Sequence, residues 1–218
     1  MMRAIDNLVS DRAAPAMIAI MVNHGGGDGI GSERGHEYDT MSDVYVTFIE
    51  SEVLPAVASY LPIKTAYPNL KFTSNPEGRA AMGCSSGAAA AMTMAWFGKD
   101  LYRRVLSYSG TFVDQQDPKI QSYPHGAWEY HEHLIAETTP SRPIRIYLEV
   151  GENDLRASDP ESTLHNWVLA NQRMAAALKA KGYHYQYQFA QGAVHCDSGV
   201  IGQTLYDALK WLWRGYPI

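Results

Sequence analysis

The chain has 218 residues, of which 46% are hydrophobic and 19% charged, and its formal net charge is -5. These values are ordinary for a globular protein with a sizeable core, and the acidic balance argues against a nucleic-acid partner. No apolar stretch reaches the length of a membrane-spanning helix, and the first residues lack the hydrophobic segment of a signal peptide. We therefore expect no nucleic-acid and no membrane partner.

The first part of the chain alternates helical and strand patterns. Residues 3–10 fit the end of a helix, and residues 16–22 form a continuous apolar run typical of a buried strand. A glycine-rich loop is expected over residues 24–31. Residues 42–60 have apolar side chains at helical spacing, which predicts an amphipathic helix with a kink at Pro55.

The alternation continues to the end of the chain. Strands are expected over residues 79–82, 104–109, 143–150 and 183–189, and helices over residues 88–97, 164–181 and 200–213. Gly182 is expected to end the helix before it, and residues 110–141 are irregular. Strands that alternate with helices indicate a mainly parallel sheet flanked by helices. Because no repeat or linker interrupts the pattern, the sequence predicts one α/β domain over residues 1–218.

Residues 83–87 (Gly-Cys-Ser-Ser-Gly) have the Gly-x-Ser-x-Gly spacing of a nucleophile elbow. A short apolar strand precedes them and an alanine-rich helix follows, so the chain turns sharply and presents Ser85 at the apex. The two glycines remove side chains that would collide at such a turn. Ser85 would lie at a helix N-terminus, where free amides favour developing negative charge. The alternative is a Gly/Ser-rich turn without chemistry.

Partners for Ser85 are expected at the carboxyl ends of later strands, where open α/β sheets bind ligands. Asp154 follows the strand over residues 143–150, and His195 follows the last strand. The order Ser, Asp, His is that of the α/β-hydrolase triad, in which histidine takes the serine proton and aspartate orients the imidazole. In the alternative, Asp154 only closes a turn, Glu152 is a rival carboxylate, and His195 is a structural loop histidine.

The two cysteines are sequence neighbours of two of these residues: Cys84 precedes Ser85 and Cys196 follows His195. If Ser85 and His195 meet, the two cysteines come within disulfide range. A disulfide would imply a secreted or periplasmic protein, although no signal peptide is visible. The alternative is a pair of small buried thiols.

The Cys-Ser … Asp … His-Cys arrangement of these five residues resembles the tannase and fungal feruloyl esterase family. In that family a disulfide ties the elbow to the histidine loop. The resemblance is confined to these residues, because this chain is far shorter.

A wider resemblance covers most of the chain. Residues 79–87 (Arg-Ala-Ala-Met-Gly-Cys-Ser-Ser-Gly), residues 107–110 (Ser-Tyr-Ser-Gly), Asp154 and His195 are similar to the esterase D family. Residues 34–38 (Arg-Gly-His-Glu-Tyr) are similar to its enterochelin-esterase-like branch. The family also includes bacterial feruloyl esterases. It implies an α/β-hydrolase fold and hydrolysis of carboxylic esters with no metal and no cofactor.

One consequence of this resemblance concerns the oxyanion hole. The amide of Ser86, directly after the nucleophile, is the first expected donor. The second would come from Gly25 or Gly26, because residues 24–27 (His-Gly-Gly-Gly) look like the oxyanion loop of lipases. A glycine-rich surface loop is the equal alternative.

A second consequence concerns the sheet. Members of the family begin with further strands, and we expect this chain to start after them, inside the first helix. A gap between the strand at residues 16–22 and the elbow strand would leave an unpaired edge, which is a costly arrangement. We therefore expect either direct pairing of these two strands or a homodimer that covers the edge.

The function that the sequence predicts is that of a serine esterase. The substrates expected are hydroxycinnamate-type (feruloyl) or other small aryl or short-chain esters, hydrolysed through an acyl-enzyme. Trp128 and Tyr130 either line an aromatic acyl pocket or cover the edge of the core. His131 and His133 lack a completing ligand motif, so no metal is expected. The alternatives are a siderophore trilactone esterase and, from another class, a non-catalytic binding protein derived from an α/β-hydrolase.

Overall fold

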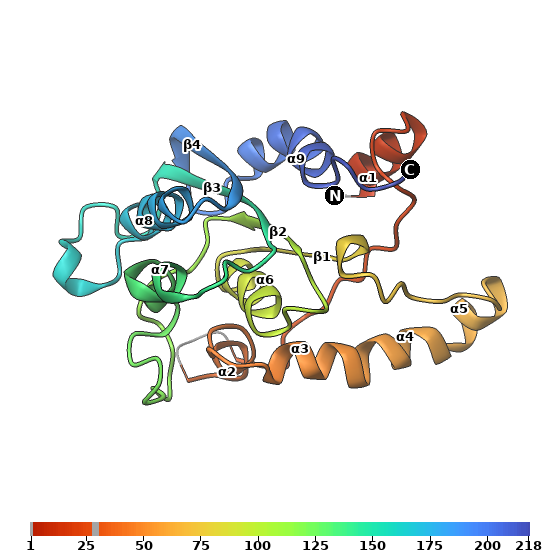
Figure 1. The fold of residues 1–218 in the computed structure, drawn as a ribbon, viewed down its shortest axis with the longest axis horizontal. Coiled ribbons are helices and arrows are strands. Elements are labelled where there is room, and N and C mark those ends of the chain that lie inside the picture. The colour runs from red at the N-terminus through yellow and green to blue at the C-terminus, as the bar shows by residue number, and fades with distance from the viewer. Residues whose placement is uncertain (1, 28–30) are drawn as a thin grey trace.

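A four-stranded parallel sheet forms the centre of the computed structural model, which describes residues 2–27 and 31–218 (Figure 1). The strands are β1 (Ala80–Cys84), β2 (Arg104–Tyr108), β3 (Arg145–Asn153) and β4 (His184–Val194), in the order β1-β2-β3-β4. Cys84 pairs with Tyr108, and Tyr108 pairs with Glu149. The register therefore brings the segments after β1 and β2 to the same edge as the last third of β3. The parallel sheet predicted from the sequence is confirmed.

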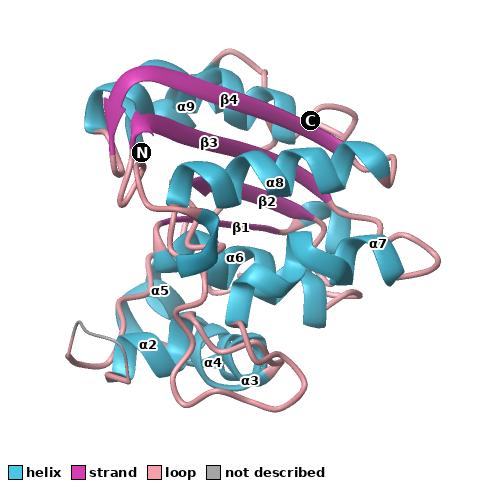
Figure 2. Ribbon diagram, turned by 90° about the vertical axis from the view of Figure 1, so that its left-hand side faces the viewer, coloured by secondary structure: helices cyan, strands magenta, loops and turns pink. Residues whose placement is uncertain are grey.

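Helices cover both faces of this sheet (Figure 2). One face carries α6 (Ser86–Phe97) and α8 (Trp167–Ala180), and the other carries α1 (Met2–Ser10) and α9 (Ser198–Leu212). Successive strand residues point to opposite faces of the sheet. Val105, Ile146 and Leu148 pack in the core on the side of α6 and α8, and Leu106 and Tyr147 pack in the core on the side of α1 and α9. All five are buried, because helices cover both faces of these strands. None of the helices described is both long and apolar enough to cross a bilayer.

The helix predicted over residues 42–60 is continuous but changes its hydrogen-bonding pattern. It consists of α3 (Val44–Phe48), the π-helical η1 (Ile49–Val53) and α4 (Leu54–Ser59). The amide of Leu54 donates to the carbonyl of Ile49, five residues earlier. The widened turn lies directly before Pro55, which has no N–H with which to continue the regular ladder.

Several shorter elements complete the described chain. They are α2 (Glu33–Tyr38), α5 (Leu61–Ala66), η2 (Pro76–Gly78), η3 (Gly126–Trp128), η4 (Tyr130–Leu134), α7 (Ile135–Glu137) and η5 (Glu161–Thr163). Gly182 has a φ of 74° and its amide donates to the carbonyl of Lys179, so it ends α8 as predicted. The glycine-rich loop expected over residues 24–31 falls partly on residues 28–30, which lie outside the described residues.

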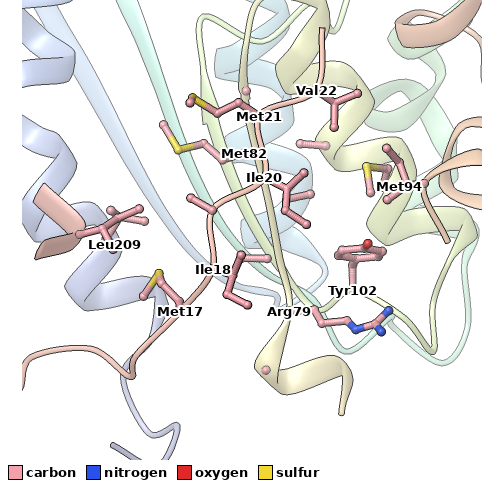
Figure 3. A pocket seen from close by; sticks show the side chains of 18 of the residues that line it. Met17, Ile18, Ile20, Met21, Val22, Arg79, Met82, Met94, Tyr102 and Leu209 are labelled. Carbon is pink, nitrogen blue, oxygen red and sulfur yellow. The ribbon is translucent and has the colours of Figure 1, made fainter. Parts of the chain in front are cut away.

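The strand predicted over residues 16–22 is wrong for the described structure, because this segment has no strand pairing. It passes beside β1, and no backbone hydrogen bond between described residues joins the two (Figure 3). Its end is held by α2 instead, since the Tyr38 hydroxyl donates to the Val22 carbonyl at 3.1 Å. Residues 2–15 contain no strand either. The expected direct pairing with the elbow strand is therefore absent.

An apolar trough of about 860 Å³ takes the place of that pairing. Its walls are the segment 16–22 and the outer edge of β1, with Ile20, Val22, Met82 and Met94 among the side chains that face it (Figure 3). A strand edge that faces an apolar trough leaves backbone N–H and C=O groups without partners. Of the two outcomes expected from the sequence, the homodimer stays a prediction.

If a second copy covers this edge, light scattering should give a mass above the 24.2 kDa of one chain. Met82→Lys should shift the population toward the monomer, because a lysine on an edge strand opposes pairing with another chain. Met82 is 37% exposed, so the change is compatible with folding, which far-UV circular dichroism checks. Val44→Lys, at a 69% exposed position on α3, is the control and should leave the mass unchanged. A wild-type mass of one chain at every concentration contradicts the prediction.

Candidate active site

The turn between β1 and α6 is sharp and presents Ser85 at its apex. Ser85 has φ 58° and ψ -130°, a conformation that is unfavourable for a residue with a side chain. A Cβ atom at Gly83 would lie 2.1 Å from the backbone of Gly87, so only glycine fits at position 83. At Gly87 itself a Cβ would meet nothing within 4 Å, so the collision expected at the second glycine is not found. The strand-turn-helix context predicted for the elbow is confirmed.

His195 and Asp154 come together beside this turn. The Nδ1 atom of His195 lies 2.5 Å from Oδ1 of Asp154, and the same oxygen accepts the amide of Leu155 at 2.7 Å. Asp154 is 3% exposed, so its carboxylate is held in one place between these donors. The rival Glu152 instead accepts the amide of Gly192 at 2.8 Å. Asp154 is thus the carboxylate that orients the His195 ring.

A disulfide joins Cys84 to Cys196, as the sequence predicts. The two Cα atoms are 6.0 Å apart across 112 positions of sequence. The bond ties the residue before Ser85 to the residue after His195. The amide of Cys196 also donates to Oγ of Ser109 at 2.9 Å, which adds a contact to the end of β2. The histidine loop is therefore anchored directly to the elbow.

The Ser85 hydroxyl has a neighbour that the sequence did not indicate. Its Oγ lies 3.3 Å from Oγ1 of Thr111, and no hydrogen bond joins it to His195 within the described residues. Thr111 comes shortly after β2, so the rule that polar groups gather at the carboxyl edge of the sheet could have pointed to it. Trp167 donates from Nε1 to the same threonine oxygen at 3.3 Å. No pattern in the sequence places this tryptophan near Ser85.

The two expected oxyanion donors are placed differently. The amide of Ser86, in the first turn of α6, has no acceptor within the described part of the chain. The amide of Gly25 donates to the Glu37 carboxylate, at 3.0 Å and 3.2 Å from its two oxygens. Gly25 is therefore engaged by α2, whereas Gly26 makes no such bond within residues 2–27 and 31–218.

A buried polar cluster supports the first turn of α6. The Ser86 hydroxyl donates to Asp39 Oδ2 at 3.1 Å and accepts from Arg34 at 2.9 Å. Gln115 reaches both Asp39 and Ser86, at 3.0 Å and 3.2 Å. Burial raises the pKa of Asp39, while its hydrogen bonds oppose that rise. This cluster fixes α2 against the elbow helix and so holds the Ser86 amide in place.

Trp128 and Tyr130 do not line a pocket in this structure. They are 1% and 0% exposed, and both belong to the core beside α6. The Tyr130 hydroxyl is paired with Thr93 at 2.9 Å. Trp128 and Tyr130 therefore cover the core, and the alternative prediction that they line an aromatic acyl pocket is wrong for this structure.

The histidines near these aromatics are also accounted for. Burial lowers the pKa of His131 to about 3, and its Nε2 lies 3.0 Å from the Phe112 carbonyl, so it is a neutral donor. Atoms of Glu129, Glu132 and His133 that could act as metal ligands lie within 4.8 Å of one another. Within this group Glu129 Oε2 lies 3.1 Å from His133 Nε2, so these two side chains contact each other directly.

Comparison with known proteins assigns the chain to a family. The model of the Putative esterase family matches residues 1–211. The chain belongs to this family. No protein with a curated description matches it.

Solved structures of other esterases share the fold of this Putative esterase member. An enterochelin esterase from Shigella flexneri has a TM-score of 0.66 at 20% identity, covering 95% of this chain and 45% of that one. A ferulic acid esterase has a TM-score of 0.65 at 19% identity, covering 97% and 76%. A ferulic acid esterase of the fungus Anaeromyces mucronatus has a TM-score of 0.58 at 16% identity, covering 95% and 68%. These structures show the α/β-hydrolase fold, and the chain spans less than half of the enterochelin esterase.

Glu149 is a buried carboxyl group that the sequence did not single out. It is 1% exposed on β3, beneath the site. Burial raises the pKa of Glu149 to about 7, and the neighbouring Asp154 carboxylate adds to this effect. The folded chain therefore holds this proton more tightly than the unfolded chain does.

The Glu149 proton makes stability depend on pH. Between about pH 4.5 and 7 the folded state binds more protons than the unfolded state, so the free energy of unfolding falls as pH rises through this window. Glu149→Gln should remove this part of the fall, as urea titrations from pH 4.5 to 8 would measure. Equal slopes for wild type and Glu149→Gln would rule the assignment out.

The disulfide should contribute strongly to stability, because it closes a loop across 112 positions. Cys84→Ala combined with Cys196→Ala should lower the free energy of unfolding by about 4 kcal/mol, slightly less than the chain-entropy model gives for so long a loop. Thermal unfolding measures the change, and reductant should lower the melting temperature of the wild type but not of the variant. Two reactive thiols in denatured, unreduced wild-type protein would refute the bond.

Proposed function

We propose that this Putative esterase family member is a serine esterase in which Ser85 is the nucleophile, His195 the general base and Asp154 the residue that orients it. The observation that carries the proposal is the 2.5 Å contact between His195 Nδ1 and Asp154, in a loop bonded through Cys196 to the elbow of Ser85. A histidine held through Nδ1 exposes Nε2 for proton transfer. These residues stand at the carboxyl edge of the sheet, where α/β folds place ligands.

The proposed reaction has two halves. Ser85 Oγ attacks the ester carbonyl as its proton passes to His195 Nε2, and the protonated imidazole then gives that proton to the departing alcohol. Water next attacks the acyl-enzyme, with His195 again as the base, and releases the acid. Asp154, hydrogen-bonded to Nδ1, stabilises the imidazolium. The Ser86 amide donates to the oxyanion, and we assign the second donation to Gly26, because Glu37 holds the Gly25 amide.

The substrates we propose are hydroxycinnamate-type or other small aryl or short-chain esters. The ferulic acid esterases that share the fold support this class. The enterochelin esterase that shares the fold supports a siderophore trilactone as the second candidate. Turnover of methyl ferulate without turnover of a catecholate trilactone supports the first class, and the reverse result supports the second.

Ser85→Ala should fold normally and lose esterase activity by about 10⁴-fold or more in kcat, because the covalent step is removed. Hydrolysis of a chromogenic acetate ester measures the loss, and thermal unfolding checks the fold. Ser59→Ala, on α4, is the matched control and should keep full activity. A Ser85→Ala preparation with wild-type turnover contradicts the mechanism.

The non-catalytic alternative is tested with the wild type alone. An active serine esterase should be labelled covalently at Ser85 by an alkyl phosphonate ester, and mass spectrometry locates the adduct. If the wild-type chain shows neither turnover of any ester nor this label, it is a binding protein and not an enzyme.

A further inference from the structure

Thr111 lies against the proposed nucleophile through two separate contacts. Its amide donates to the Ser85 carbonyl at 3.2 Å, and its hydroxyl oxygen lies 3.3 Å from Ser85 Oγ. Thr111 is 1% exposed, so solvent does not compete for either contact. The threonine hydroxyl is therefore fixed at hydrogen-bonding distance from the oxygen that would attack the substrate.

Trp167 connects Thr111 to the histidine. It is the first residue of α8, whose N-cap Asn166 accepts the amide of Leu169 at 2.9 Å. Its indole Nε1 donates to Thr111 Oγ1 at 3.3 Å, and its ring meets the His195 ring edge to face with centroids 6.2 Å apart. Trp167 is 4% exposed. One side chain thus touches both the partner of the proposed nucleophile and the proposed base.

The direction of the hydrogen bond between Trp167 and Thr111 follows from the groups involved. An indole N–H can only donate, so Thr111 Oγ1 must accept from Trp167. The indole N–H uses one of the two lone pairs of Oγ1, and the hydroxyl hydrogen of Thr111 is available to its neighbour Ser85 Oγ, although either oxygen can be the donor across this 3.3 Å contact. A serine oxygen that accepts from Thr111 has its own proton free to point at His195. Loss of the indole N–H leaves both lone pairs of Thr111 Oγ1 open to Ser85, which favours the reverse bond, in which the Ser85 proton points to Thr111 and not to His195.

We propose that Trp167 and Thr111 are positioning residues that set the direction of the Ser85 hydroxyl, so that its proton is delivered to His195. The proposal rests on the serine-esterase function above. As the bond from Ser85 Oγ to the carbonyl carbon forms, the Ser85 proton moves to His195, while Thr111 keeps its own proton and donates to Oγ throughout. We call this series of hydrogen bonds, from Trp167 through Thr111 to Ser85, the relay. It breaks and forms no covalent bond itself and needs no further reactant.

Thr111→Val keeps the shape of the side chain and removes the hydroxyl. We expect kcat for the chromogenic acetate ester to fall about tenfold with KM unchanged, the size of effect expected when one hydrogen bond to the reacting oxygen is lost. Thr111→Ser, which restores the hydroxyl, should recover most of kcat. A purely structural role would affect stability and would not be rescued in kcat by the serine.

Thr93→Val is the matched control for a buried threonine. The Thr93 hydroxyl is 2.9 Å from Tyr130 in the core, away from the described contacts of Ser85. This variant should lower the melting temperature and leave kcat unchanged. It separates loss of a buried hydrogen bond from loss of the relay.

The link between Trp167 and Thr111 is tested with Trp167→Phe, which retains an aromatic ring and lacks the N–H. It should lower kcat to an extent similar to Thr111→Val, and the double variant should lose no more than the larger single loss, because both changes break the same relay. Wild-type kcat in Thr111→Val, or a double variant whose loss is the product of the two single losses, overturns the proposal.

Covalent labelling distinguishes failure of the relay from failure of the function. If wild-type Ser85 reacts with the phosphonate ester and Thr111→Val reacts at the same rate, the relay is wrong and the serine mechanism stands. If wild type is neither labelled nor active, both are wrong. Slower labelling of Thr111→Val and Trp167→Phe, with wild-type rates in Thr93→Val, supports the relay.

Discussion

The close approach of β1 and α6 at Gly83 is the constraint on which the rest of the site depends. There is no space for a side chain at this position, so the chain reverses within a few residues and holds Ser85 in an unfavourable backbone conformation. Such a conformation persists only when its surroundings hold it. The Ser85 amide donates to the Tyr108 carbonyl, its carbonyl accepts from Thr111, and the adjacent Cys84 is bonded to Cys196.

These supports also determine where the other functional groups lie. The disulfide brings the residue after β4 to the elbow, and β3 ends at the same edge with Asp154. Asp154 then has one oxygen shared between Leu155 and the His195 ring, which leaves the imidazole little freedom to turn. The strand order β1-β2-β3-β4 thus places the elbow at one end of the sheet and the histidine loop folds back across it.

β1 must support the elbow rigidly, although only one of its two edges is hydrogen-bonded to another strand in the described structure. It carries the elbow, which needs a rigid support, and it is also an edge strand of the sheet in the described structure. Its outer side faces an apolar trough in place of a hydrogen-bonded strand (Figure 3). The inner side compensates in part, since β1 pairs along its whole length with β2 and packs against α6. The strain at Ser85 is therefore held from the inner side of the sheet and by the disulfide.

The types of the main elements could be read from the sequence, because they depend on local periodicity and on glycine and proline. The elbow turn, the contact between Asp154 and His195, and the disulfide could also be predicted, since each depends on sequence spacing around strand ends. The strand expected at residues 16–22 could not be settled in this way: an apolar run becomes a strand only when a neighbouring strand offers hydrogen bonds, and α2 holds this segment away from β1.

The surroundings of Ser85 were decided by the tertiary structure alone. The segment that contains Trp128 and Tyr130 has no clear periodicity in the sequence, and only tertiary packing places their side chains in the core beside α6. Thr111 and Trp167 are 56 positions apart and become neighbours because the segment after β2 and the first residue of α8 meet beside the elbow. Local sequence determines which residues can turn, pair or donate. Which of them meet depends on contacts between distant segments, and no local pattern encodes those contacts.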